Sequence, residues 1–360
     1  MQSMKRLEIG VFLPIGKQGF VLSTNAQAYV PSFADQLEIT RIAEDIGLDY
    51  VFSMAKWRGF GGTTQFWDSS FESFSLMAAL AATTDRIRLI ATVNPLLFHP
   101  ALMAKMAATV DEVSQGRLGL NIITGSVLSE YTQMGVLPDN YDQRRYEYAS
   151  EWMHVLKRLW SEDHVTHDGE FFQLVDCVSE PKPVQRPRPQ IICAASSEEG
   201  LRFTAREADY SFINGDGLEG VKQQSLNSKR IALEEGTTIK TATTTLLGIR
   251  GTTEEASTYW EHLMEGADDE AIFNMGTAFS QRTRENKKRG ALLLDGKKKI
   301  HSGRPFVGAP QQIADEIIKL AVEGDIDSIL LVFPDYVDGL RRFGSDVMPL
   351  LSEAIDVGFS

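Results

Sequence analysis

The sequence predicts an α/β protein, a (β/α)8 TIM barrel that carries insertions. Eight short apolar runs, each followed by a helical pattern, alternate along the 360 residues. The runs are apolar on both faces, which is typical of strands in a parallel sheet that helices cover. A chain of this length can form such a barrel as one domain, and eight strand–helix units are the number that a barrel needs.

The units follow one another from the N-terminus. The first run, 8–14, follows a basic pair as a signal peptide would, but it contains Pro14 and lacks a small-residue cleavage site, so we interpret it as the first strand. Its helix is expected at 32–47. The other runs and helices are 49–55 with 69–84, 87–93 with 100–116, 117–125 with 144–160, 190–196 with 197–208, 210–215 with 218–236, 241–251 with 252–266, and 328–335 with 337–355.

Three stretches interrupt this alternation, namely 126–142, 163–189 and 266–308. The second has the pattern of a hairpin followed by a proline-rich segment. Segments that follow barrel strands lie on the catalytic face, so the third is a candidate lid, and its basic cluster at 282–299 is expected to be a solvated loop. No second domain is needed, and we expect 1–360 to be a single barrel domain.

Composition excludes several classes of partner. The formal net charge of -13 disfavours binding to a nucleic-acid backbone, and no apolar run is long enough to span a bilayer. The two cysteines, Cys177 and Cys193, form neither a disulfide framework nor a zinc motif, which fits a reducing cytoplasm. We therefore expect a cytoplasmic protein with a small-molecule substrate, no nucleic acid and no membrane partner.

The loop at 53–67, "SMAKWRGFGGTTQFW", is rich in glycine but matches no nucleotide motif. Thr64 stands where G-x-G-x-x-G requires a glycine, and no Gly-Lys-Ser/Thr follows. Its aromatic residues Phe60, Phe66 and Trp67 are expected to pack in the loop or the core.

A better candidate anion site is "CAASSEEG" at 193–200, where small residues end a strand and Ser197 stands at a helix N-terminus. The free backbone N–H groups and the positive end of the helix dipole would bind a phosphate there. The alternative is ordinary N-capping by serine, with Glu198 or Glu199 completing a capping box.

Polar residues also follow the fourth strand. Asn121 lies at the inward end of a buried run, so its amide is either a satisfied structural group or a ligand contact. Glu130 lies in the loop that follows, and Arg144, Arg145 and Tyr146 open the next helix. Two alternatives remain for the arginines: an ion pair with Glu130, or contact with an anionic or planar ligand.

Other chemistries lack their signatures. There is no H-E-x-x-H, so no metal site is expected, and His164 and His167 are interpreted as surface residues of the hairpin. There is no G-x-S-x-G elbow, and only Asp216 and Asp335 could serve as glycosidase carboxylates at strand ends. Strand ends rich in amides and hydroxyls suit a protein that positions a cofactor.

Four segments together resemble one family. They are "SMAKWRGFGGTTQFWDSSFESFSLMAALAATT", "NIITGSVLSEYTQMG", "RRYEY" and "ICAASSEEG". They resemble the flavin-dependent, bacterial luciferase-like monooxygenases, most closely the pyrimidine monooxygenases of uracil catabolism. In the second half, "DGEFFQLVDCVSEPKPVQRPRPQ", "INGDGLEGVKQQ" and "FVGAPQQIADEI" are also similar to the dimethylsulfone and alkanesulfonate monooxygenases of that family.

The resemblance implies a barrel that binds reduced FMN (FMNH2), uses O2, receives its flavin from a separate NAD(P)H-dependent reductase and forms homo-dimers or tetramers. It places Thr92 and Asn121 as catalytic residues that hold oxygen beside the flavin, where a peroxide forms at N5. By position, the implied flavin contacts are Ala55, Lys56, Asn121, Glu130, Arg145, Tyr146 and, at the phosphate, Ser197.

This chain departs from the pyrimidine enzymes around the implied substrate pocket, which comprises Phe52, Phe60, Trp67 and Ser126. Ser126 replaces a tryptophan, Phe52 replaces a smaller aliphatic residue, and the loop 93–100 differs. We expect attack on an electrophilic carbon of a small heterocycle or amide other than uracil, with room for a bulkier one. The alternatives are C–S cleavage of a sulfone or sulfonate, flavin binding without turnover, and an F420 dehydrogenase on the same barrel.

Overall fold

A closed barrel of eight parallel strands forms the centre of the protein. The computed structural model describes residues 4–125, 127–215, 217–280, 300–301 and 305–358. Neighbouring strands pair in parallel from β1 to β11, and β11 pairs with β1 to close the ring, so the predicted barrel and its eight strands are confirmed. The strands are β1 (Glu8–Phe12), β2 (Tyr50–Phe52), β3 (Arg88–Val93), β4 (Leu118–Ile122), β7 (Gln190–Ala194), β8 (Tyr210–Phe212), β9 (Lys240–Ile249) and β11 (Ser328–Val332).

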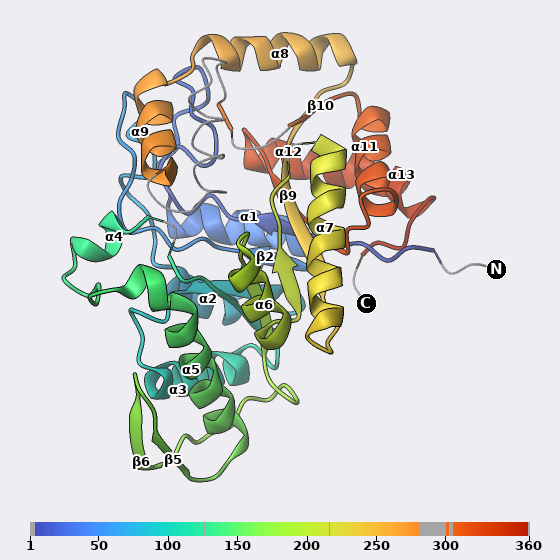
Figure 1. The fold of residues 1–360 in the computed structure, drawn as a ribbon. Helices are drawn as coiled ribbons and strands as arrows, with labels where there is room; N and C mark the ends of the chain where they lie inside the picture. The colour runs from blue at the N-terminus through green and yellow to red at the C-terminus, as the bar shows by residue number, and fades with distance from the viewer. Residues whose placement is uncertain (1–3, 126, 216, 281–299, 302–304, 359–360) are drawn as a thin grey trace.

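Helices surround the barrel (Figure 1). Those that follow the first six strands are α1 (Phe33–Asp45), α2 (Ser73–Ala81), α3 (Pro100–Val113), α4 (Ser129–Thr132), α5 (Tyr141–Ser161), α6 (Glu198–Glu207) and α7 (Gly217–Glu234). The later elements are α8 (Thr253–Glu265), α9 (Asp269–Ser280), β10 (Phe306–Gly308), α11 (Pro310–Val322), α12 (Tyr336–Arg342), the π-helical turn η1 (Phe343–Val347) and α13 (Met348–Ser352). No helix in the described part of the chain has the length and apolar character needed to cross a membrane.

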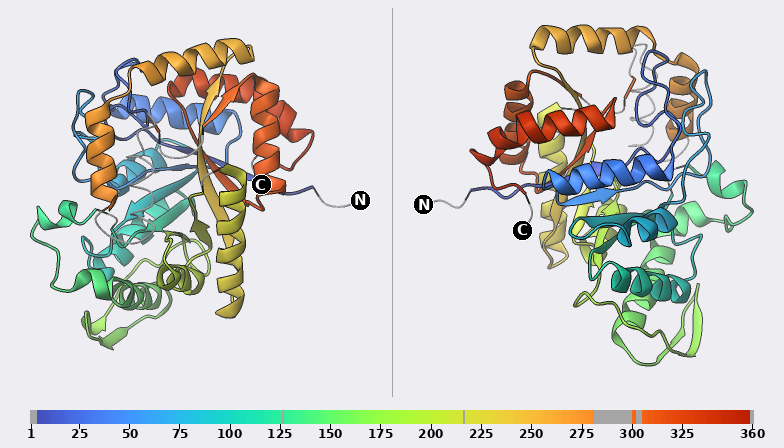
Figure 2. Two further views of the ribbon diagram at one scale, coloured as in Figure 1. Left: turned by 45° about the horizontal axis from the view of Figure 1, so that its top comes forward. Right: turned by 180° about the vertical axis from the view of Figure 1, so that it is seen from behind.

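The helix that packs between α7 and α13 is α11, whereas the seventh helix was expected at 252–266. That segment forms α8, which lies on the outside of the helical ring, beyond α12 (Figures 1 and 2). The reason is the length of β9, whose last residues, Leu247–Ile249, pair with β10 rather than with a barrel strand. The extended strand carries α8 beyond the wall, and the chain returns through α11 before it enters β11.

Aromatic side chains fill the interior of the barrel. Tyr50, Phe52 and Phe212 lie in one buried cluster, and Phe12 packs against Phe52 edge to face at 5.0 Å. Gly10 allows this filling, because a Cβ there would lie 2.5 Å from the Tyr50 ring. The barrel is therefore a packed core, and a ligand can bind only at one of its ends.

The two ends of the barrel differ. The described termini lie on one side, where the strands begin, while α4 and α9 lie on the other (Figure 1). Below the helical ring, β5 (Val165–Asp168) and β6 (Gln173–Cys177) form the antiparallel hairpin expected from the sequence. The Glu151 carboxylate of α5 holds the hairpin turn by accepting from the backbone N–H groups of Phe171 and Phe172.

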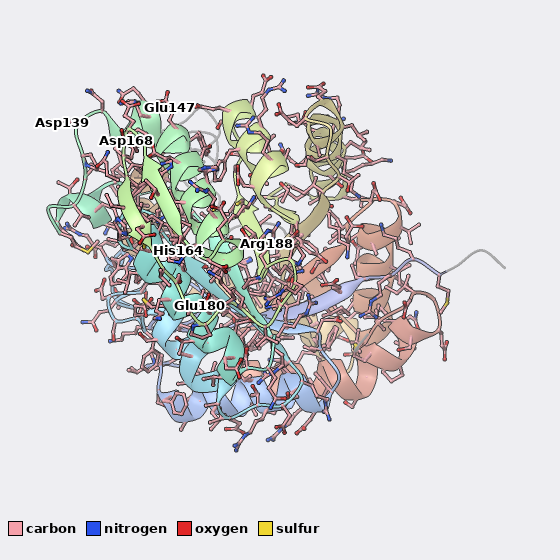
Figure 3. All side chains as sticks on the ribbon, turned by 90° about the horizontal axis from the view of Figure 1, so that it is seen from below. Asp139, Glu147, His164, Asp168, Glu180 and Arg188 are labelled. Carbon is pink, nitrogen blue, oxygen red and sulfur yellow. The ribbon has the colours of Figure 1, made fainter. Side chains whose placement is uncertain are left out.

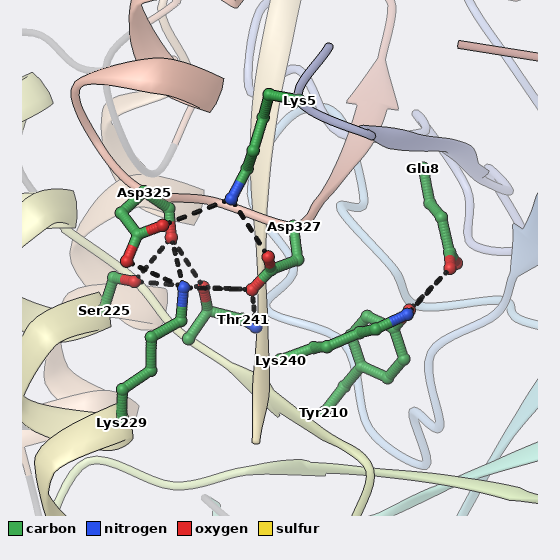
Figure 4. Close-up of polar contacts among 9 residues, drawn as sticks. All are labelled: Lys5, Glu8, Tyr210, Ser225, Lys229, Lys240, Thr241, Asp325 and Asp327. Carbon is green, nitrogen blue, oxygen red and sulfur yellow. Dashed lines mark hydrogen bonds and ion pairs between the residues drawn. The ribbon is translucent and has the colours of Figure 1, made fainter. Parts of the chain in front are cut away.

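A cluster of ion pairs lies at the end where the strands begin (Figure 4). The Lys5 ammonium bridges Asp325 and Asp327 at 3.2 and 3.1 Å, and Lys229 of α7 pairs with the same two carboxylates. Burial opposes ionisation of Asp327, but the Thr241 amide and the two ammonium groups outweigh it. The pKa of Asp327 therefore lies below its usual range in the folded chain.

We expect Asp327→Asn to lower the free energy of unfolding by about 1–3 kcal/mol at pH 7, because a charge-assisted acceptor is lost. A carboxylate whose pKa is lower in the folded state stabilises the fold fully above its unfolded pKa of about 3.9, and this contribution is lost as the pH falls below it. The difference from the wild type should therefore shrink between pH 7 and pH 3.5 in urea unfolding. Asp45→Asn on the exposed face of α1 is the control, and an equal loss at both pH values would contradict the account.

Candidate active site

The predicted catalytic pair lies where β3 and β4 end. Thr92 and Asn121 stand opposite each other in the parallel register, and both are buried, with 3% and 4% of their surface exposed. Leu120 and Ile122, which flank Asn121, belong to the apolar layer between strands and helices. The alternation of side chains along a strand therefore directs Asn121 into the barrel interior.

Hydrogen bonds settle which way the Asn121 amide points. The Thr92 Oγ1 donates to the Ser53 carbonyl at 2.5 Å, and the Asn121 Nδ2 lies 3.0 Å from the same Oγ1. A carbonyl oxygen only accepts, so the Thr92 proton is committed to Ser53, and the Asn121 Nδ2 must be the donor to Thr92. The Asn121 Oδ1 is left buried without a hydrogen-bond partner.

Further polar atoms without partners gather at the same end. Three of them belong to residues at or just beyond the carboxyl ends of β2, β3 and β4: Trp57 Nε1, Asn94 Nδ2 and Asn121 Oδ1. Within the described residues, the other three are Gln36 Oε1, Ser179 Oγ and Thr204 Oγ1. Buried polar atoms are costly when unpaired, so these atoms mark this end of the barrel as a place where a ligand would supply partners.

A buried ion pair joins the loop after β2 to α4. The Lys56 ammonium contacts the Glu130 carboxylate, each side chain being 6% exposed, and the Trp57 backbone N–H donates to the same carboxylate at 2.8 Å. The expected alternative of an arginine paired with Glu130 is wrong. Arg144 pairs instead with Glu147 and Glu170, and Arg145 pairs with Asp142 at 2.7 Å.

Aromatic rings cover this ion pair on one side. The Lys56 Nζ lies 4.3 Å from the centre of the Phe60 ring, and Trp67 packs against Phe60 at 5.7 Å. Phe66 stacks on Trp67 at 4.6 Å, and Phe279 of α9 closes the cluster. The aromatic residues of the loop therefore shield the charged pair from water, and they do so together with α9.

The loop after β2 and α9 are also joined by hydrogen bonds. The Asp268 carboxylate, just before α9, accepts from the Thr64 backbone N–H and from its hydroxyl, both at 2.7 Å. Asn274 of α9 donates to the Phe60 carbonyl at 2.9 Å. Gly62 makes this approach possible, since it has a φ of +75° and a Cβ there would lie 2.6 Å from the Asp268 carboxylate.

The candidate phosphate site lies at the N-terminus of α6. The Ser197 Oγ caps the helix by accepting from the Gly200 backbone N–H at 3.2 Å, and it lies 3.5 Å from the Tyr146 hydroxyl. The expected capping box with Glu198 or Glu199 is wrong, because the residue that would have to complete it is Gly200. A Cβ at position 200 would strike the Tyr146 hydroxyl, so glycine keeps this corner open.

The remaining predicted positions are more dispersed. Ala55 is half-buried directly before Lys56. Phe52 lies below the candidate site, where it stacks on Phe212 inside the barrel at 5.8 Å. Ser126 lies outside the described residues, and so do 281–299 and 302–304 of the predicted lid.

The described ranges hold no cluster of three or more His, Cys, Asp and Glu side chains that could bind an ion. Figure 3 places His164 on the outer hairpin, where it is exposed and contacts Asp176 at 2.7 Å. His167 is less exposed than expected for a surface residue, because its ring packs against Glu151 at 3.1 Å.

Sequence reasoning missed several residues of this end of the barrel. Ser53 and Ser73 hold Thr92 in place, the first through its carbonyl and the second by accepting from the Thr92 backbone N–H at 2.8 Å. Asn94 and Trp57 were also passed over. Their position just beyond strand ends was the signal available, but only the hydrogen-bond geometry shows that each keeps an unpaired polar atom.

Known proteins resemble this chain over nearly its whole length. A family model described as luciferase-like monooxygenase matches residues 7–327. Pyrimidine monooxygenase RutA of Acinetobacter baylyi is 38% identical over 358 residues, which cover 98% of this chain and 96% of that protein. The protein of the same name from Methylorubrum extorquens is 41% identical over 355 residues, or 96% and 93% of the two chains.

Solved structures show the same fold at lower identity. Riboflavin lyase RcaE, with modified FMN and its substrate riboflavin, has a TM-score of 0.88 at 22% identity, over 99% of this chain and 94% of that one. The long-chain alkane monooxygenase LadA has a TM-score of 0.80 at 20% identity, over 97% and 92%.

We expect Glu130→Gln to lower the free energy of unfolding by about 3–5 kcal/mol, because it leaves the buried Lys56 ammonium without its counter-charge. The double variant Lys56→Met/Glu130→Gln should recover part of this loss in chemical denaturation. The control is Glu162→Gln, which breaks the solvent-exposed pair with Arg158 and should leave the free energy of unfolding nearly unchanged. If the losses of free energy in Glu130→Gln and Lys56→Met simply add in the double variant, the two side chains are not coupled.

Proposed function

The chain belongs to the luciferase-like monooxygenase family and is a flavin-dependent monooxygenase, and from this premise we propose that it uses FMNH2 and O2 to oxygenate an electrophilic carbon of a small neutral heterocycle or amide. The observation that carries the proposal is the buried, unpaired Asn121 Oδ1 at the carboxyl end of β4. An acceptor held in a fixed direction needs an N–H or O–H donor, and the N–H groups of a reduced flavin or of an amide substrate provide one.

The residues present fit FMN at both of its ends. For the ring, the site offers Asn121 Oδ1, the half-buried Ala55 and the paired Lys56 and Glu130. For the phosphate, it offers Ser197 and the Tyr146 hydroxyl at the start of the ten-residue helix α6, whose free N–H groups and dipole favour an anion. Arg145 precedes Tyr146, and its side chain is 10% exposed. We assign it to the phosphate end of FMN.

Reduced flavin held by these residues would supply the electrons that activate O2. The residues of the chain orient the bound groups and exclude water. Thr92, fixed by the Ser53 carbonyl and by Ser73, holds the Asn121 amide in one direction, so that its Oδ1 meets the bound ring or the substrate. Desolvation is needed because water and stray protons divert activated oxygen from the substrate.

We assign water exclusion to the aromatic cluster of Phe60, Phe66 and Trp67 together with α9. Phe279 of α9 packs on Phe60, and the Asp268–Thr64 hydrogen bonds attach the start of α9 to the same loop. On this proposal α9 forms part of the lid expected at 266–308, within a single domain. Phe52, Phe60, Trp67 and Ser126 remain the proposed substrate pocket.

A separate NAD(P)H-dependent reductase is proposed as the source of reduced flavin, as the similarity to the pyrimidine monooxygenases implies. We also propose that the enzyme acts as a homo-oligomer.

The test of the function is oxygen labelling. The purified chain, FMN, NADH and a flavin reductase are incubated under ¹⁸O₂ with neutral lactams such as uracil and the larger quinazoline-2,4-dione. Mass spectrometry should find one ¹⁸O atom in the product. Product formation without flavin, or product without label, would contradict the proposal.

Asn121→Ala should retain FMN but lower product formation by about 100-fold, the size of effect seen when one positioned polar group at a reacting centre is removed. Reduced flavin should still be consumed, so the ratio of product to NADH oxidised is the measurement. Asn227→Ala on α7 serves as the control. A ratio unchanged in Asn121→Ala would remove Asn121 from the mechanism.

Ser197→Ala should weaken FMN binding by about 1 kcal/mol, or up to about 3 if the hydrogen bond is charge-assisted. The substitution also removes a helix cap, so Ser32→Ala at the cap of α1 is the matched control and should leave FMN affinity unchanged. Fluorescence titration of FMN measures both. Equal affinities of Ser197→Ala and wild type would place the phosphate elsewhere.

A further inference from the structure

Asn94 is a buried amide directly after β3, two residues beyond Thr92. Only 1% of its surface is exposed. Its Oδ1 accepts from the Leu96 backbone N–H at 2.9 Å, which determines the orientation of the amide, because an N–H must face an oxygen. The Nδ2 therefore points the other way, and it has no hydrogen-bond partner.

The position of Asn94 relates it to the catalytic pair. The ladder between β3 and β4 continues past the strand ends, since the Ile123 N–H donates to the Val93 carbonyl at 3.0 Å. Side chains two residues apart on an extended chain face the same side, about 6–7 Å from each other. Asn94 thus stands on the interior side with Thr92, one step nearer to the rim.

Gly125, three residues beyond β4, leaves space beside the Nδ2 of Asn94. A Cβ at that position would lie 3.2 Å from the Nδ2 and 2.6 Å from the Tyr131 ring, and the φ of Gly125 is +80°. Both the space and the backbone conformation favour glycine here. A side chain at residue 125 would crowd the unpaired Asn94 Nδ2, and glycine leaves that space free.

The unpaired atoms at this end are electrically neutral and of both kinds. Asn121 Oδ1 accepts, whereas Asn94 Nδ2 and Trp57 Nε1 donate. The Lys56 charge beside them is balanced by Glu130. A ligand that carries a carbonyl oxygen next to an N–H complements such a set, whereas a sulfonate anion brings acceptors only and would set an oxygen against Asn121 Oδ1.

We propose that Asn94 is a specificity-determining residue whose Nδ2 donates a hydrogen bond to a carbonyl oxygen of a neutral lactam substrate, near the N–H-accepting Asn121 Oδ1. The inference rests on the proposed function for its choice of substrate. It goes further in naming the group that selects a carbonyl and disfavours an anion.

The test is equilibrium binding to the FMN-loaded protein, measured by calorimetry with uracil, quinazoline-2,4-dione and methanesulfonate. The wild type should bind at least one lactam and not methanesulfonate. Asn94→Leu, which keeps the approximate size but no donor, should bind that lactam at least about 10-fold more weakly. Asn94→Asp, which keeps the acceptor for Leu96, should lose affinity in the same way.

The control is Ser179→Ala, which removes another buried polar atom without a partner, between β6 and β7, and should leave lactam affinity unchanged. FMN affinity should stay unchanged in all variants. Three outcomes would each overturn the inference. They are equal lactam affinity in Asn94→Leu, Asn94→Asp and wild type, no binding of any lactam, and tighter binding of methanesulfonate than of a lactam. Lactam binding that depends on Asn94 without labelled product under ¹⁸O₂ would instead refute the proposed function alone.

Discussion

The register between β3 and β4, which sets Thr92 opposite Asn121, is the constraint on which the site depends. Because the two strands are parallel and the side-chain period is two, both residues face the interior, and a shift by one residue would turn either of them into the helical layer. The Thr92 proton is committed to the Ser53 carbonyl, so the barrel itself selects which end of the Asn121 amide faces a ligand. The acceptor is thus oriented before anything binds.

Buried polar atoms without partners at the carboxyl ends of the strands lower the stability of the fold, and each of them does so until a ligand supplies a partner. Ion pairs at the opposite end of the barrel offset part of this loss. The opposite end is rich in compensated charge, where Lys5 and Lys229 meet Asp325 and Asp327. Barrel enzymes in general separate function from stability between their two faces, and this chain follows that pattern.

Much of the fold was predictable because the signals are local. A strand covered on both faces is a continuous apolar run, so all eight strands were found. The helix that packs beside α7 as the seventh of the ring was missed because an amphipathic pattern does not reveal which strand a helix will cover, and the extended β9 carries α8 outside the ring. The register that sets Thr92 opposite Asn121 joins residues that no local pattern connects, and the resemblance supplied that pair.

The parts of the site that were missed depend on distant contacts. Lys56 and Glu130 are 74 residues apart, and nothing in either segment indicates the pair, so an arginine nearer in sequence was expected instead. Asn94 makes an ordinary local turn with Leu96, and its significance lies in the atom that stays unpaired, which only three-dimensional packing reveals. Asn121 Oδ1 thus needs an N–H or O–H donor from the bound ring or the substrate. A crystal structure of the FMN complex with a bound lactam should show a ligand N–H within hydrogen-bond distance of Asn121 Oδ1 and the phosphate at Ser197. A flavin bound elsewhere, or Asn121 turned with its Nδ2 toward the ligand, would refute this role of Asn121.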